Sequence, residues 1–295
     1  MGNQNKDSDG VDLSFLEGND APSGDVLARN ETTTDEFPRD VILPQCVAVG
    51  LEWIGKRREQ QDRYWFGEIK TLSGEKVFLA LVCDGVGNCV DGAKGAQTAV
   101  DAVREFVSKL TQTDLLNVDT VRLAFTRIIV RAHKCVLVTE PRGMSTTIAA
   151  ILVVRGHLFS ANAGDSRVYT LFNHLAQLSM DHRQVSLREN GERVVSPNVI
   201  TRALGQEGDL FPHVEDHACA LPGAFVLFSD GFSPFYDQAE AVGEVLSLAL
   251  EGDPSEHEAR IAADLILKEL QELVQGDTYV DNATVLIGYI TPVTA

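Results

Sequence analysis

Three aspartates stand where apolar, strand-like segments end or begin. Asp84 and Asp230 each follow such a run, and Asp281 comes three residues before another. If these strand ends meet, their carboxylates repel one another and lose solvation, which costs roughly several kcal/mol each unless cations neutralise them. Carboxylates, carbonyls and water select hard divalent ions such as Mg²⁺ or Mn²⁺, whereas zinc usually recruits His or Cys. The pattern therefore indicates a divalent-metal site.

Glycine follows two of these aspartates, at Gly85 and Gly231. A glycine lets the backbone approach closely, so that its carbonyl could serve as a further metal ligand. The alternative is that an Asp-Gly pair is only a turn, as Asp91-Gly92 could be. Spacing alone leaves both interpretations open, because it does not say which strand ends are neighbours.

The elements that must position these residues come in blocks. Apolar residues recurring at three and four predict helices over 96–110, 121–136 and 255–273, the last one capped by Ser255. Strands are predicted at 77–83, 147–154, 157–163, 167–172, 224–228 and 284–290. Consecutive strands beside helix blocks, without regular alternation, predict an α+β architecture in which helices cover antiparallel sheets.

The amino-acid composition limits the kinds of molecule that the chain is expected to bind. The chain has 295 residues, 44% of them hydrophobic, and a formal net charge of −18 with no Lys/Arg-rich run, so we expect neither nucleic acid nor membrane as a partner. Its five cysteines include no C-x-x-C pair, and no apolar stretch approaches the roughly 20 residues of a membrane-spanning helix. The N-terminus also lacks the apolar core of a signal peptide. We expect a cytoplasmic monomer.

Two regions are predicted. Residues 1–42 are rich in Asp and Glu and poor in large apolar residues, which predicts a disordered acidic arm. A solvating tail is the simpler interpretation, and a regulatory or docking segment is the alternative. Residues 43–295 are predicted to form one catalytic domain, and deletion of the arm should spare catalysis.

Short motifs then occur in a fixed order. They are Arg57 to Asp62, Cys83 to Gly87, Gly143 to Thr147, Asn162 to Arg167, Asp181-His182, Ile200 to Gly205, Ser229 to Gly231, and Asp281 to Thr284. This ordered set resembles the PPM-type (type-2C) serine/threonine protein phosphatases, and among them the compact bacterial-type enzymes. The resemblance spans about residues 46–290. It implies hydrolysis of phosphoserine and phosphothreonine in proteins, and a four-layer α/β/β/α sandwich in which two central antiparallel β-sheets are flanked by helices.

The same resemblance implies roles for single residues. Asp84 would bridge two Mn²⁺ or Mg²⁺ ions, Gly85 would offer its carbonyl, and Asp230 and Asp281 would complete the ligands. Asp62 would act mainly through metal-bound water. A hydroxide formed from water between the ions would attack phosphorus directly, without a covalent enzyme intermediate.

Two further positions are assigned in this way. Arg57 would bind the phosphoryl oxygens, with its neighbour Arg58 as the fallback. With Asp84, Asp230, Asp281 and Asp62, Arg57 makes up the expected catalytic set. Asp165 matches a position that helps to hold a third, weaker metal ion in bacterial-type members.

Departures from the family pattern keep an alternative open. Gln61 replaces a common Glu, which predicts slightly weaker metal binding, and Val86 replaces the histidine that eukaryotic members use as a general acid. Pro234 stands where an Asp usually supports the third metal, and Asp237 could substitute. The alternative is a catalytically weakened pseudophosphatase that binds phosphoproteins or regulates them.

The expected partners are phosphorylated proteins, with a cognate Ser/Thr kinase or its targets among them. The residue that bears the phosphate stays open, because no motif distinguishes phosphoserine or phosphothreonine from phosphotyrosine or from a small phosphate ester.

Overall fold

The computed structural model describes residues 37, 44–188, 191, 193–251, 254–278 and 280–292. Asp35–Ala295 forms one compact unit. The predicted acidic arm, 1–42, lies outside the described residues except for Phe37, so the predicted boundary between arm and domain stays a prediction.

Two five-stranded antiparallel sheets form the centre of this unit. The β1 sheet has the order β1, β12, β11, β6, β7, which are Gln45–Trp53, Ala283–Thr291, Gly223–Phe228, Arg167–Leu171 and Leu175–Gln177. The β3 sheet has the order β10, β5, β4, β3, β2, which are His213–Ala218, His157–Ala163, Ile148–Val154, Lys76–Cys83 and Arg63–Lys70. The described residues also contain a separate hairpin, β8 (Arg183–Leu187) with β9 (Arg193–Ile200).

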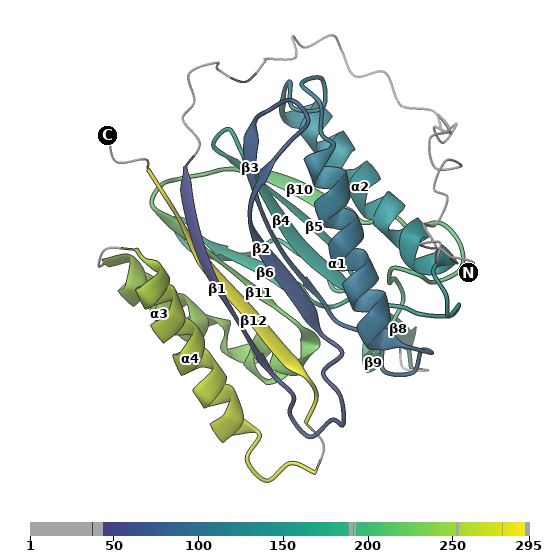
Figure 1. The fold of residues 1–295 in the computed structure, drawn as a ribbon. Helices are drawn as coiled ribbons and strands as arrows, with labels where there is room; N and C mark the ends of the chain where they lie inside the picture. The colour runs from purple at the N-terminus through teal and green to yellow at the C-terminus, as the bar shows by residue number, and fades with distance from the viewer. Residues whose placement is uncertain are drawn as a thin grey trace, which may run out of the picture. The chain divides into compact units, whose positions relative to one another are not determined.

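Helices cover the outer faces of both sheets. Helices α1 (Gly92–Ser108) and α2 (Val118–Val138) pack on the β3 sheet, and α3 (Ala239–Glu251) and α4 (Glu256–Leu273) pack on the β1 sheet (Figure 1). A 3₁₀ segment, η2 (Asp230–Gln238), links β11 to α3. The predicted four-layer α/β/β/α sandwich is thus confirmed. Among the described residues, no helix combines the length and the apolar character that crossing a bilayer requires.

Helix starts follow the capping residues in the sequence. Asn117 caps α2 with a complete capping box to Thr120, and the Ser255 hydroxyl accepts a hydrogen bond from the Glu258 amide (3.3 Å). Asp91, which the sequence left as a turn candidate, accepts from the Lys94 amide (2.9 Å) and caps α1. Each such cap contributes about 1 kcal/mol. The Asp91 cap matters for the site, because it fixes the helix start beside Gly85.

The core explains why β3 is an uninterrupted apolar run. Phe78, Ala80 and Val82 pack between the two sheets, while the alternate residues Leu79 and Leu81 face the helices, and all five are buried. A strand covered on both faces needs apolar side chains at every position. The rigid strand then ends at the polar segment that follows Cys83.

Phe37 packs onto the domain although it belongs to the predicted arm. It is 5% exposed, and its amide donates to the Leu116 carbonyl (3.2 Å). Its ring meets the His157 ring edge-on, with centroids 5.1 Å apart, and lies 5.7 Å from the Arg155 guanidinium. Arg155 itself is held by two 2.8 Å bonds to Glu75. Phe37 is therefore anchored on the domain by a backbone hydrogen bond and by ring contacts.

Candidate metal and phosphate site

The strand ends that carry the three aspartates meet at one rim of the sandwich. Strands β11 and β12 are antiparallel neighbours, with Phe228 opposite Val285, so the end of β11 lies beside the start of β12. This register places Asp230 next to the segment that contains Asp281. Asp84 follows β3 in the facing sheet, and the charges of Asp230 and Asp281 lie near enough to raise the pKa of Asp84.

Two glycines allow this approach. A Cβ at Gly231 would overlap the Asn282 carbonyl oxygen, and a Cβ at Gly85 would overlap the backbone of Gly92 at the start of α1. Any side chain at either position would force the segments apart. The Asp-Gly pairs at 84–85 and 230–231 are therefore close backbone contacts as well as turns.

The backbone of Asp84 is held by the threonines of the segment before β4. The Thr146 hydroxyl and the Thr147 amide both donate to the Asp84 carbonyl at 2.8 Å, and the Asp84 amide donates to the Thr147 hydroxyl at 3.1 Å. Thr147 Oγ1 is in turn 2.7 Å from the Ser166 hydroxyl. These bonds fix the Asp84 backbone and leave its carboxyl group directed to other partners.

Asp62 is fully buried and only half satisfied. Its Oδ2 accepts from the hydroxyls of Ser229 (2.8 Å) and Thr284 (2.7 Å). Its Oδ1 is buried with no hydrogen-bond partner among the described residues. An unpartnered buried carboxylate oxygen costs about 1–3 kcal/mol or more, so it is a position at which a ligand would be stabilising.

Burial and mutual repulsion raise the pKa of these acids. Burial raises the pKa of Asp84 well above its ordinary range, and the neighbouring Asp230 and Asp62 raise it further. Burial also raises the pKa of Asp230 to about 7, with Asp165 as the next cause, and the pKa of Asp62 to about 6. The two raised values belong to interacting carboxyls, because Asp84 and Asp230 each influence the pKa of the other. Without a cation, the cluster retains protons near neutral pH.

The donor set fits a hard divalent cation. Within the described residues, no three acidic, His or Cys side chains already stand in the geometry of a formed metal site. Asp84 instead contacts Asp230, and Asp281 pairs with Arg57. The available donors are carboxylate and carbonyl oxygens, which suit Mg²⁺ and Mn²⁺. Binding would require the ionised forms of these acids and would compete with the Arg57–Asp281 pair.

Arg57 lies at the rim of the cluster. Its Nη2 donates to Asp281 Oδ2 at 2.6 Å, and its side chain is 30% exposed. It passes close to Gly87, where a Cβ would lie 3.0 Å from Arg57 Nη1. The fallback residue, Arg58, is exposed. The Arg57 guanidinium thus both contacts an acid of the cluster and remains accessible to solvent.

Asp165 lies beside the cluster and is paired with a cation of the protein. It is 2% exposed, and its Oδ2 accepts from Arg183 Nε at 3.0 Å. Pro234 lies within η2 and is exposed. The third-metal role that the resemblance implies for Asp165 remains a prediction at this point.

Several residues that hold the site together lie in the sequence motifs, but their hydrogen-bond partners could not be predicted from the sequence. Asn282 Oδ1 accepts from the Gln61 amide, and Asn282 Nδ2 donates to the Ile54 carbonyl, both at 2.9 Å. Ser229 and Thr284 hold Asp62 across sequence separations of 167 and 222 residues. Their position next to motif aspartates was the available signal, but the pairing depends on the fold.

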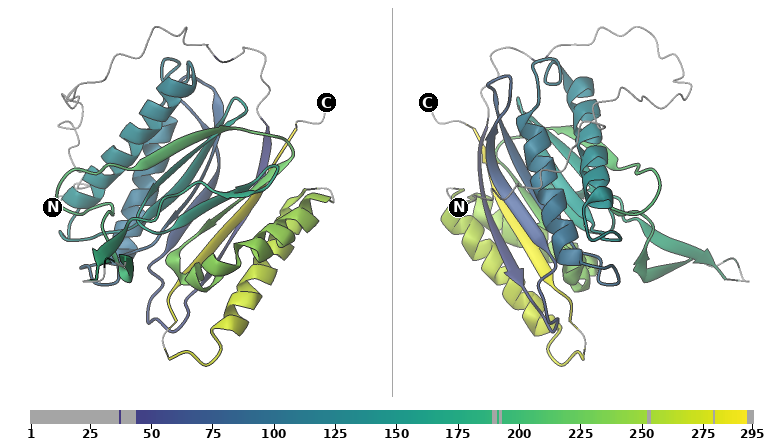
Figure 2. Two further views of the ribbon diagram at one scale, coloured as in Figure 1. Left: turned by 180° about the vertical axis from the view of Figure 1, so that it is seen from behind. Right: turned by 45° about the vertical axis from the view of Figure 1, so that its right-hand side comes forward.

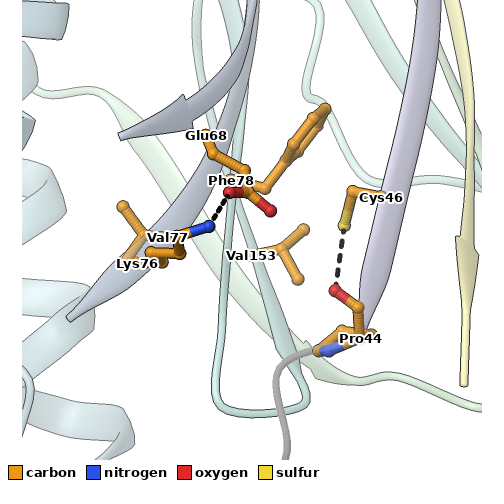
Figure 3. Close-up of a pocket in the computed structure, with 7 residues that line it drawn as sticks. All are labelled: Pro44, Cys46, Glu68, Lys76, Val77, Phe78 and Val153. Atoms are coloured by element: carbon orange, nitrogen blue, oxygen red, sulfur yellow. Dashed lines mark hydrogen bonds and ion pairs between the residues drawn. The ribbon is translucent and has the colours of Figure 1, made fainter. Parts of the chain in front are cut away.

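A small hollow at the opposite end of β3 is not part of this site. It is lined by Pro44, Cys46, Glu68, Lys76, Val77, Phe78 and Val153 (Figure 3). Cys46 donates to the Pro44 carbonyl (3.8 Å), and Lys76 pairs with Glu68 (2.7 Å). Burial raises the pKa of the Cys46 thiol above its ordinary range, so the thiol is a poor nucleophile. The hollow carries no chemistry of its own.

Comparison with known proteins gives the class. The fold matches the Streptococcus agalactiae (S. agalactiae) serine/threonine phosphatase, with a TM-score of 0.62, 22% identity, and coverage of 83% of this chain and 100% of that one. It also matches the catalytic domain of the serine/threonine protein phosphatase PstP in complex with two manganese ions, with a TM-score of 0.59, 23% identity, and coverage of 83% and 98%. The fold is that of bacterial serine/threonine phosphatases.

Sequence comparison gives the family. The model of the Protein phosphatase 2C family matches residues 49–265. The serine/threonine phosphatase stp of Listeria monocytogenes is 29% identical over 180 residues, which cover 55% of this chain and 69% of that protein. The chain belongs to the protein phosphatase 2C family and is a protein-serine/threonine phosphatase. The predicted resemblance to the bacterial-type enzymes is confirmed.

Proposed function

We propose that the chain hydrolyses phosphoserine and phosphothreonine in proteins with two divalent cations, Mn²⁺ or Mg²⁺, held by its buried acids. The ligands are the side chains of Asp84, Asp230 and Asp281 and the carbonyl of Gly85, and Asp62 completes the set. The observation that carries the proposal is the convergence of these acids at one rim, where Asp62 Oδ1 is buried without a hydrogen-bond partner among the described residues, because such a cluster gains stability when cations neutralise it. The manganese complex of PstP supports it.

The bound cations would supply a water whose pKa is low enough to provide hydroxide near neutral pH. The chain's own residues do the positioning. The Thr146 and Thr147 bonds hold the Asp84 backbone, and the Ser229 and Thr284 hydroxyls fix one oxygen of Asp62 while leaving the other available. No nucleophilic side chain is needed, so no covalent enzyme intermediate is proposed.

Arg57 is proposed to bind the phosphoryl oxygens. A guanidinium matches phosphate geometry with two parallel donors, which a lysine ammonium does not. In the structure one Arg57 nitrogen donates to Asp281, which orients the side chain along the rim. Substrate binding would use this guanidinium fork.

Metal-dependent turnover tests the proposal directly. A phosphothreonine peptide incubated with the purified chain should release phosphate in the presence of Mn²⁺, and chelation should abolish this release. A phosphotyrosine peptide and a small phosphate ester, assayed in parallel, measure the preference for the residue that bears the phosphate. Tight binding of two Mn²⁺ without turnover of any of these substrates would contradict the proposal and favour a pseudophosphatase.

Arg57→Ala should lower kcat/KM for the phosphothreonine peptide about 100-fold, the usual effect of removing one donor to transition-state charge. Arg58→Ala is the matched control. It removes the same charge from the neighbouring residue, whose side chain is exposed. It should change kcat/KM by less than about threefold. The reverse ranking of the two variants would transfer the phosphate-binding role to Arg58.

The proposal includes a cytoplasmic, monomeric enzyme that acts on phosphoproteins, with a cognate Ser/Thr kinase or its targets as partners. All five cysteines are free thiols in the structure, which supports a reducing compartment. Relatives named as serine/threonine phosphatases support the class of substrate.

A further inference from the structure

Asp165 lies at the edge of the acidic cluster and already forms an ion pair with a cationic side chain of the protein, Arg183. It follows β5 and the left-handed Gly164 (φ 107°), and its side chain is 3% exposed. The next residue, Ser166, has its hydroxyl 2.7 Å from Thr147 Oγ1, which accepts from the Asp84 amide, so Asp165 lies at the edge of the cluster. The guanidinium of Arg183, with a side chain 15% exposed, donates to it at 3.0 Å. This is a buried ion pair at the edge of the proposed metal site.

The backbone places Arg183 there. The preceding residue, His182, exchanges bonds with Gly164: its amide donates to the Gly164 carbonyl (3.0 Å), and its Nδ1 accepts from the Gly164 amide (3.2 Å). The Thr201 amide donates to the His182 carbonyl at 2.7 Å, which closes the base of the β8–β9 hairpin. Arg183 is the first residue of β8, so it leaves this fixed base in the direction of Asp165.

The neighbouring acid has its own partner. Arg167 donates to both oxygens of Asp181, at 2.9 and 2.6 Å, and its side chain is also 15% exposed. Arg167 thus pairs with Asp181, and Arg183 pairs with Asp165. A third divalent ion at Asp165 would have to displace this guanidinium, and Pro234 supplies no side-chain donor to assist it.

We infer that the Arg183 guanidinium serves as the built-in third cation of the site, so that a third divalent ion binds Asp165 only when the Arg183–Asp165 pair opens. The inference rests on the two-metal function proposed above. It also makes Arg183 a positioning residue, since the pair connects the β8–β9 hairpin to the carboxylate cluster. Figure 2, right, shows this hairpin extending away from the two sheets.

Removing Arg183 would take its guanidinium away from a buried carboxylate at the edge of the cluster, which would favour a metal cation in its place. Bound Mn²⁺ can be counted by electron paramagnetic resonance, a readout that does not depend on turnover. The wild-type chain should bind two Mn²⁺ per molecule before any third. In Arg183→Gln, a third Mn²⁺ should bind at least about tenfold more tightly than in the wild type, the factor expected when a charged hydrogen-bonded pair no longer competes.

Three further variants make the test specific. Arg167→Gln is the matched control, because it removes an equally exposed guanidinium from the neighbouring acid, and its Mn²⁺ titration should match the wild type. Asp165→Asn added to Arg183→Gln should abolish the third site. Arg183→Lys keeps the positive charge and should keep the third site weak. A thermal melt of each variant establishes that it is folded.

The outcomes separate this inference from the proposed function. Two Mn²⁺ in every variant, or a wild-type chain that already binds three with similar affinity, would overturn the role of Arg183 and leave the two-metal function standing. A chain that binds no Mn²⁺ would overturn both. If Arg183→Gln does not fold, a third site that stays weak in Arg183→Lys and becomes tighter in Arg183→Met supports the inference, and an unchanged Arg183→Met overturns it.

Discussion

Asp84→Asn is expected to lower kcat for a phosphothreonine peptide at least about a thousandfold, because it removes the carboxylate that is proposed to bind the cations. The fold should survive, since the Asp84 backbone bonds to Thr146 and Thr147 do not involve the side chain. The metal-free variant should even melt at a higher temperature than the wild type above neutral pH, because one source of repulsion is gone. Phosphate release and thermal denaturation measure the two effects.

Asp101→Asn provides the control for this prediction. Asp101 lies on α1 with its side chain 58% exposed, so the same substitution removes a charge where water screens it. Turnover and melting temperature should both stay near wild type. If Asp84→Asn turned over peptide at the wild-type rate, the assignment of the site to these acids would be wrong.

The metal-free protein should lose stability as pH rises through neutrality. The pKa of Asp230 is raised to about 7 and that of Asp84 well above its ordinary range, so both hold protons in the folded state that the unfolded chain releases near pH 4. Stability that depends on these protons is present at low pH and is lost as pH rises through the folded-state pKa. Each carboxyl contributes a slope of about 1.4 kcal/mol per pH unit while it remains protonated.

The measurement is a series of thermal melts between about pH 6.5 and 8.5. The window begins there because burial lowers the pKa of His182 to about 4, and that group favours the folded state as pH rises up to its unfolded pKa near 6.5. We expect the melting temperature of the metal-free chain to fall by roughly 3 to 5 °C per pH unit. Saturating Mn²⁺ should flatten this dependence, as should Asp84→Asn in part. A melting temperature that rose with pH without metal would contradict the protonated cluster.

The sequence was sufficient for elements with strong local signals. Helix α4 begins after the predicted cap Ser255, and β5 has the predicted bounds, because apolar periodicity and capping chemistry are local properties. Strand β10 carries polar and charged residues such as Glu215 and Asp216 at a sheet edge, so alternation is weak there. The β8–β9 hairpin packs too little apolar surface to leave a pattern, with Val185 and Leu187 exposed.

For the site, the sequence provided the acids but not their contacts. The motif order singled out Asp84, Asp230 and Asp281, and the antiparallel register of β11 and β12 explains why two of these come together. Pairing of Arg183 with Asp165 depends on how a hairpin base docks on a loop, which no spacing rule encodes. The same holds for the hydroxyl partners of Asp62.

The bonds of Asp62 have a consequence for biosynthesis. Its oxygen is held by Ser229 and Thr284, and β1 pairs only with β12 in its sheet. A nascent chain that has not yet released residues 281–291 from the ribosome therefore lacks one acid of the cluster, one clamp on Asp62 and the partner of its first strand. During translation the segments made earlier can collapse, but the proposed metal site is complete only after β12 has emerged, so we expect dephosphorylation to begin no earlier than that point.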